Sequence, residues 1–143
     1  MNNYESYSLY VSAISLLFSV YVFFKNKLYS NSSQESLVFS NITNAKNDVS
    51  KAVESVSALY EDFTPLGNSV RYTLHDARLG LIQAYEFAGQ QYFSGAINRW
   101  RFDQLYSSEI MDLWTDPVYR ELLQKGYYPS LIKLRKKYEY NVH

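Results

Sequence analysis

The chain begins with a mainly apolar run, from Ser6 to Phe24, in which no side chain is charged. Lys25 and Lys27 follow the run directly. A helix over this run would be about 28 Å long, close to the roughly 30 Å hydrocarbon core of a bilayer. The pattern therefore predicts a transmembrane anchor in residues 1–29.

Charges around the run predict how this anchor is oriented. Glu5 is the only charged side chain before it, whereas both lysines follow it. Because basic residues favour the cytoplasmic side, we expect the N-terminus outside and the C-terminal part in the cytoplasm. A cleaved signal peptide does not fit, because no basic residue precedes the run and no small-residue cleavage site follows it. A buried helix of a soluble domain is the remaining alternative.

Serines recur within the run at spacings of four and three, which places them on one face of a helix. This serine face consists of Ser8, Ser12, Ser15 and Ser19. In lipid, small residues let two helices approach closely, so the face could pack in a homo-oligomer. Alternatively, the hydroxyl groups could bond to carbonyl groups of their own helix. Both interpretations fit the sequence equally well.

A heptad pattern follows the polar residues 26–34, which predict a juxtamembrane linker or a helical extension. Its apolar positions are Val38, Ile42, Ala45, Val49, Ala52, Val56, Leu59 and Phe63. Steps of four and three predict a helix from about Glu35 to Phe63, with Ile42, Val49 and Val56 at the a positions of a heptad. Residues 30–68 thus predict a linker and a helix that packs on a second copy or, slightly favoured, on later helices of the chain.

The remaining pattern, residues 69–143, predicts a helical domain. A break at residues 64–68 precedes a second long helix that ends at Gly95. Gly80 and Gly89 within it predict a close helix crossing at one or both positions. Shorter helices are predicted to begin after Asn98, at Asp116 and Pro117, and at Tyr128 and Pro129. The predicted fold is all-α, with a transmembrane helix before a small cytoplasmic domain of two long and several short helices.

Composition restricts the chemistry. The 143 residues include 14 basic and 14 acidic side chains, so nucleic acid is not an expected partner. There is no cysteine, the two histidines are not spaced as a zinc pair, and the five glycines occur singly. Thiol catalysis, histidine-based metal sites and glycine-rich phosphate loops therefore have no candidate residues. We expect no catalytic residue, no cofactor and no metal, and hence not an enzyme.

Basic and aromatic residues form a candidate contact set for a ligand or a lipid. Alternation of arginine with tryptophan is typical of sites for bases or phosphates, and a basic helix near a bilayer can contact anionic lipid. The set consists of Arg99, Trp100, Arg101, Lys133, Arg135, Lys136 and Lys137. A solvated helix face is the default interpretation of the C-terminal members, and contact with lipid comes second. Aromatic residues also crowd the middle of the domain, and most of them are expected to pack in the small core. They are Tyr85, Tyr92, Phe93, Trp100, Phe102, Tyr106, Trp114 and Tyr119.

One stretch resembles a group of known proteins. Residues 85–97, followed by Arg101, Phe102 and Tyr106, place a tyrosine-x-x-glycine turn at a helix end and a phenylalanine at the start of the next helix. The stretch resembles uncharacterised small bacterial proteins with one N-terminal span and a cytoplasmic helical domain. The resemblance implies a bacterial inner-membrane location and names no activity.

These observations lead to two functional hypotheses. The first is a single-pass, membrane-anchored helical protein that acts by protein–protein interaction and self-association, without catalysis. The alternative is a ligand-responsive membrane effector of a bacterial defence or stress system. In that alternative the cytoplasmic domain binds a nucleotide-type signal and alters membrane integrity.

Overall fold

The computed structural model describes the backbone of residues 3–61 and 68–140, and the side chains of residues 12–58 and 71–140. Five helices make up this part of the chain, so the all-α class is confirmed. They are α1 (Asn3–Glu61), α2 (Asn68–Ser94), α3 (Arg99–Thr115), α4 (Pro117–Lys125) and α5 (Pro129–Tyr140). The break expected around residues 64–68 falls mainly on residues 62–67, which lie outside the described residues.

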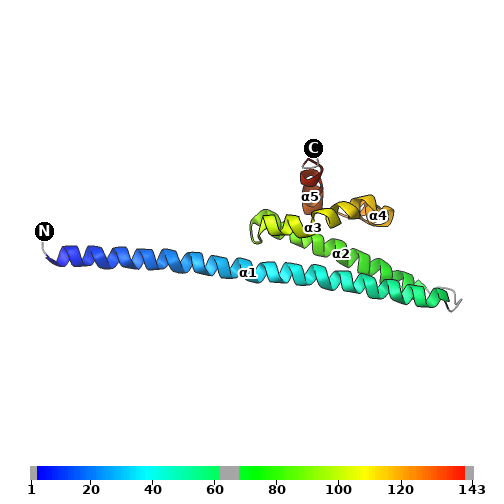
Figure 1. Cartoon of the computed structure of the whole chain (residues 1–143), viewed down its shortest axis with the longest axis horizontal. Helices are drawn as coiled ribbons and strands as arrows, with labels where there is room; N and C mark the ends of the chain where they lie inside the picture. Colours follow the sequence, from blue (N-terminus) through cyan, green and yellow to red (C-terminus); the bar gives the residue numbers. More distant parts are fainter. Residues whose placement is uncertain (1–2, 62–67, 141–143) are drawn as a thin grey trace.

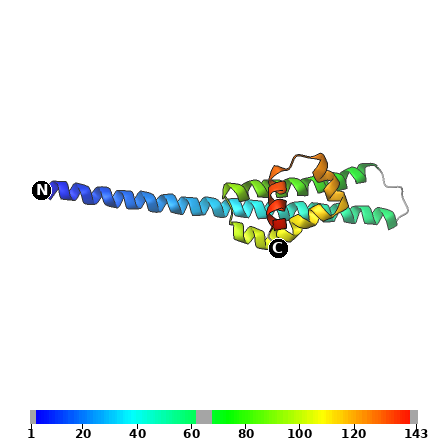
Figure 2. The ribbon, with the colours of Figure 1, turned by 90° about the horizontal axis from the view of Figure 1, so that it is seen from above.

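The 59-residue helix α1 is much longer than the rest of the molecule (Figure 1). At 1.5 Å per residue it extends for about 88 Å. Its C-terminal half lies along α2, whereas its N-terminal half extends beyond the other helices in both views (Figure 2). The polar residues 26–34 are helical and connect the two halves. We call residues 12–29 the projecting segment, and residues 30–61 and 68–140 the body.

The expected transmembrane anchor is contradicted. Within the residues that the structure describes, no helix combines the length and the apolar character needed to cross a bilayer. The described side chains of the apolar run extend only from Ser12 to Phe24, about 20 Å of helix, before Lys25. The side chains of residues 6–11 lie outside the described residues. The membrane location, the single-pass topology and the outside position of the N-terminus are therefore corrected together with the anchor.

The heptad stripe of α1 packs within the chain. Val38 and Ile42 are completely buried and belong to one core with Ile82 and Tyr85 of α2. Ala52 is buried as well, and Ala45 and Val49 pack against the same core. This arrangement confirms the intramolecular interpretation of the pattern. The side chains of the last two heptad positions, at residues 59 and 63, lie outside the described residues.

A second layer of helices covers the other side of α2. α3 and α5 contact α2, and α4 links them (Figure 1). Aromatic rings fill the junction: the Phe102 ring lies 5.5 Å from that of Tyr92 and 5.2 Å from that of Tyr106. The Tyr106 ring lies 5.6 Å from that of Phe39, so α3 also reaches α1. Most of the aromatic residues that were expected in the core therefore lie in it or pack against it.

Local signals set the ends of the short helices as predicted. Asn98 Oδ1 accepts a hydrogen bond from the backbone N–H of Arg101 and caps α3. Asp116 Oδ1 accepts from the N–H groups of Val118 and Tyr119 and caps α4, with Pro117 in the first turn. Gly95 has a φ of 75°, a backbone conformation that favours glycine after a helix.

α5 crosses α2 at Gly89, as the sequence predicted for one of two glycines. A Cβ atom at Gly89 would lie 2.8 Å from Ser130 Cβ and 3.2 Å from Leu134 Cδ1. The absence of a side chain therefore allows α5 to approach the backbone of α2. Gly80 has no such neighbour, because a Cβ there would meet no atom within 4 Å.

The two glycines give a matched pair of substitutions. We expect Gly89→Ala to lower the free energy of unfolding by about 1–3 kcal/mol, because the new Cβ overpacks the crossing. Gly80→Ala should raise it by about 0.5–1 kcal/mol, because it meets open space and removes the helix penalty of glycine. Urea unfolding followed by circular dichroism measures both. Equal shifts of the same sign would contradict the close crossing at Gly89.

Candidate interaction surface

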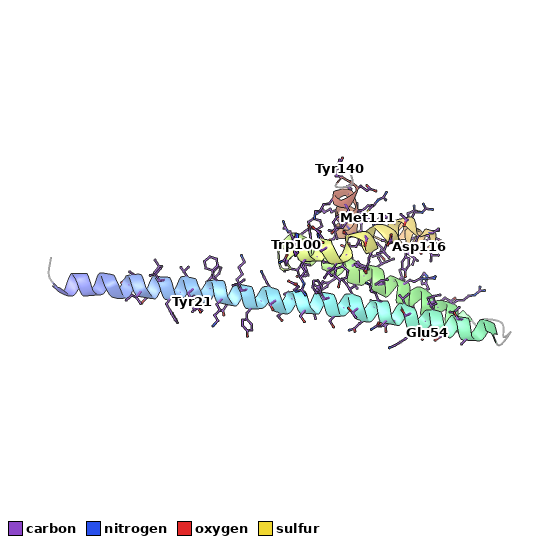
Figure 3. All side chains as sticks on the ribbon, in the orientation of Figure 1. Tyr21, Glu54, Trp100, Met111, Asp116 and Tyr140 are labelled. Carbon is purple, nitrogen blue, oxygen red and sulfur yellow. The ribbon has the colours of Figure 1, made fainter. Side chains whose placement is uncertain are left out.

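The projecting segment carries a dense set of exposed apolar side chains. Ten large ones lie within its 18 residues: Ile14, Leu16, Leu17, Phe18, Val20, Tyr21, Phe23, Phe24, Leu28 and Tyr29. The described side chains of the body include a further ten, scattered over about a hundred residues. Figure 3 shows Tyr21 on the projecting segment, far from Trp100 and Met111 on the body. Contiguous apolar surface of this kind marks an interaction site, whereas scattered apolar residues do not.

The apolar positions of the projecting segment keep the heptad register of the body. Counting back in sevens from Ile42 leads to Leu28, Tyr21 and Ile14, and counting back from Val38 leads to Phe24 and Leu17. We call Ile14, Leu17, Tyr21, Phe24 and Leu28 the free stripe. Their exposed fractions range from 59% to 70%. α1 thus has one stripe with two parts, of which α2 covers only the second.

Polar residues separate the two parts of the stripe. Asn31 and Glu35 occupy the intervening heptad positions. Glu35 Oε1 accepts a hydrogen bond from Arg101 Nη1 at 2.9 Å, and the Arg101 guanidinium lies over the Phe39 ring at 5.2 Å. This pairing ties the N-terminus of α3 to α1 at the edge of the body. The buried packing of α1 therefore ends where the free stripe begins.

The serine face lies on the other side of the projecting segment. Ser12 and Ser19 fall at f positions and Ser15 at a b position, opposite the a and d positions of the stripe. Ser19 Oγ donates a hydrogen bond of 2.9 Å to the backbone carbonyl of Ser15, which is the bonding within one helix that the sequence left open. The side chain of Ser8 lies outside the described residues.

The body is held together by a carboxylate that the sequence did not reveal. Glu86 of α2 is buried, and its oxygens accept hydrogen bonds from the N–H groups of Ser130 at 3.1 Å and Leu131 at 2.9 Å. These groups form the first turn of α5, where the helix dipole also favours a negative charge. α5 begins at Pro129 after Tyr128, a residue type that does not cap helices. The absence of a capping side chain directly before α5 was the signal in the sequence that the N–H groups of its first turn need a distant partner.

A second polar cluster lies between α2, α3 and α5. Asp103 accepts hydrogen bonds from Tyr138 at 2.6 Å, Tyr92 at 3.1 Å and Lys137 at 2.5 Å, and Lys137 also donates to Tyr92. Burial alone would lower the pKa of Lys137, but the bonds to Asp103 and Tyr92 raise it above its ordinary value. Burial, and then the bond to Asp103, raises the pKa of Tyr138. The cluster neutralises its own charge.

Five of the six basic residues of the predicted ligand set have protein partners, and the sixth, Lys136, is exposed. Lys137 pairs with Asp103, Arg135 pairs with Glu139, and Arg101 pairs with Glu35. Arg99 donates to the backbone carbonyls of Tyr92 and Phe93 at the end of α2, and Lys133 lies over the Phe93 ring. Trp100 is exposed. Arg135 and Lys136 line one hollow of about 500 Å³ together with Trp114, Leu123, Gln124, Gly126, Ile132 and Glu139.

Acidic residues do not gather into a metal site within the described part of the chain, where no cluster of three or more candidate ligands occurs. Glu109 accepts hydrogen bonds from Tyr85 and from Lys46, the latter at 2.6 Å, and thereby joins α1, α2 and α3. Asp112, its neighbour on the helix, is exposed beside a hollow of about 510 Å³. Glu109 therefore serves the packing of helices.

Comparison with known proteins gives no relative: no protein-family model, no curated protein and no solved structure matches the chain. The resemblance noted around residues 85–106 therefore stays a prediction.

The role of Glu86 can be tested by stability. We expect Glu86→Gln to lower the free energy of unfolding by about 1–3 kcal/mol, because the amide places a donor against the N–H groups of α5. Glu139→Gln, which breaks an exposed pair with Arg135, should change it by less than about 1 kcal/mol. Urea unfolding at pH 7 compares the two. A similar small effect of both substitutions would contradict the buried cap.

The polar cores predict a loss of stability in alkali. Burial, and then hydrogen bonds to Glu109 and Asp103 respectively, raise the pKa values of Tyr85 and Tyr138. Tyrosines of the unfolded chain ionise at about pH 10. The contribution of these two tyrosines to the free energy of unfolding is therefore complete below that pH and is lost as the pH rises above it. Tyr138→Phe should reduce the slope of unfolding free energy between about pH 10 and 11.5. Tyr127→Phe, at an exposed position, should leave the slope unchanged.

Proposed function

We propose that this protein acts without catalysis, by self-association and protein–protein interaction through the projecting segment of α1. The observation that carries the proposal is the row of ten exposed apolar side chains on a helix that leaves the body. Covering one such side chain contributes about 1.5–3 kcal/mol. Covering several of them can therefore offset the loss of freedom on association, about 4–15 kcal/mol.

The body supports a structural role in this proposal. Its ion pairs and buried carboxylate join helices to one another, as Lys46 with Glu109 joins α1 to α3 and Glu86 with Ser130 joins α2 to α5. Each of these polar groups contacts a neighbouring helix. The body thereby fixes the position of α1 and presents its free half to a partner.

The nucleotide-binding alternative finds less support. Apart from the exposed Lys136, its basic residues pair with acids or lie over aromatic rings, and Arg101 contacts Glu35 and Phe39 at the base of the projecting segment. Because these cations already have partners, a phosphate would have to displace several bonds. The membrane part of that alternative fails with the anchor.

Self-association can be tested by sedimentation equilibrium of the full chain. We expect a mass that rises with concentration toward a multiple of the monomer mass. A variant with Leu16, Leu17, Phe23 and Phe24 all replaced by Gln should remain monomeric over the same range, because Gln is a good helix former that removes apolar surface.

The control replaces two exposed aromatic residues of the body. Trp100→Gln combined with Tyr127→Gln should associate as the native chain does, since both side chains lie outside the projecting segment. A native chain that stays monomeric at all concentrations would overturn the proposal. So would a control variant that loses association as completely as the fourfold variant.

A further inference from the structure

The projecting segment could associate through more than one face, because large apolar side chains occur outside the free stripe as well as within it. Leu16 and Phe23 lie about 100° around the helix from Leu17 and Phe24. The exposed fractions of the two leucines are 67% and 69%, and those of the two phenylalanines are 65% and 59%. Exposure alone does not show which face associates, so we infer the face from the heptad register of α1.

The register favours the free stripe. The a and d positions that α2 covers in the body continue into Leu28, Phe24, Tyr21, Leu17 and Ile14 without a change of phase. An established helix–helix interface therefore extends in sequence beyond its partner helix. Figures 1 and 2 agree that α2 does not reach this part of α1.

Resting on the self-association proposed above, we infer that the free stripe pairs with the free stripe of a second copy of this chain. The segment from residue 12 to 29 is long enough for about two and a half heptads, or roughly 27 Å of helix. Its stripe holds large apolar side chains at five successive a and d positions, so two copies offer the same surface to each other.

Charge does not select a different partner for the stripe. The only charged side chains of the segment are Lys25 and Lys27, which fall at the e and g positions that flank the stripe. The stripe itself has no charge that would select an acidic or basic partner. Asn31 and Glu35 end the apolar positions at the edge of the body, and Glu35 already pairs with Arg101. The self-complementary part is thus limited to the projecting segment.

Two double variants of the full chain test this inference, because they remove the same residue types one position apart. The stripe variant carries Leu17→Gln and Phe24→Gln, and the flank variant carries Leu16→Gln and Phe23→Gln. We expect the stripe variant to weaken self-association at least about 100-fold, and the flank variant to change it less than about threefold, in sedimentation equilibrium. Far-UV circular dichroism should show equal helix content in both, because the body is untouched.

A third variant tests the opposite face. Ser15→Gln combined with Ser19→Gln adds bulk to the serine face and should leave association unchanged. Loss of association in this variant, or an effect of the flank variant as large as that of the stripe variant, would overturn the inference while self-association itself stands. A native chain that is monomeric and instead binds phosphatidylcholine vesicles would overturn both the inference and the proposed function.

Discussion

The packing of the α1 stripe on α2 is the interaction on which the structure depends. Val38 and Ile42 lose all contact with water there, and the rings of Tyr85, Phe102 and Tyr106 pack around the same core. Because α2 does not extend along the N-terminal half of α1 (Figures 1 and 2), this packing covers only part of a stripe that continues for five more apolar positions. The bare half of α1 follows directly from the length of its partner.

The body is built to hold that packing in one geometry. Gly89 lets α5 approach α2, and Glu86 then caps the first turn of α5 at the same crossing. Arg101 of α3 donates a hydrogen bond to Glu35 of α1 at the edge of the body. Hydrogen bonds to charged groups contribute about 1.5–3 kcal/mol each when they are shielded from water, so the buried cap exceeds the exposed pairs in importance.

The sequence predicted those features whose causes are local. The Asp116–Pro117 start, the Asn98 cap and the Gly95 turn depend on neighbouring residues, and the heptad spacing predicted a long helix correctly. It could not name the partner of the stripe, because packing on α2 and packing on a second copy require the same pattern. It missed Glu86, whose partners lie 44 and 45 residues away. It assigned Lys137 and Arg101 to a ligand because their acidic partners lie 34 and 66 residues away. The anchor was predicted from the length of an uncharged run and the lysines that follow it, but the described helix does not meet the combined requirement of length and apolarity.

In the proposed dimer, two copies of α1 lie side by side along the free stripe. Since the chain has no cysteine, Ser19→Cys places one spin label on the face that points away from the proposed contact. Electron–electron dipolar spectroscopy on the labelled full chain measures the separation of the labels in two copies. Helices packed 8–10 Å apart predict a short and narrow distance distribution. The absence of any dipolar coupling between copies, at a concentration where the native chain is fully folded, would contradict the account.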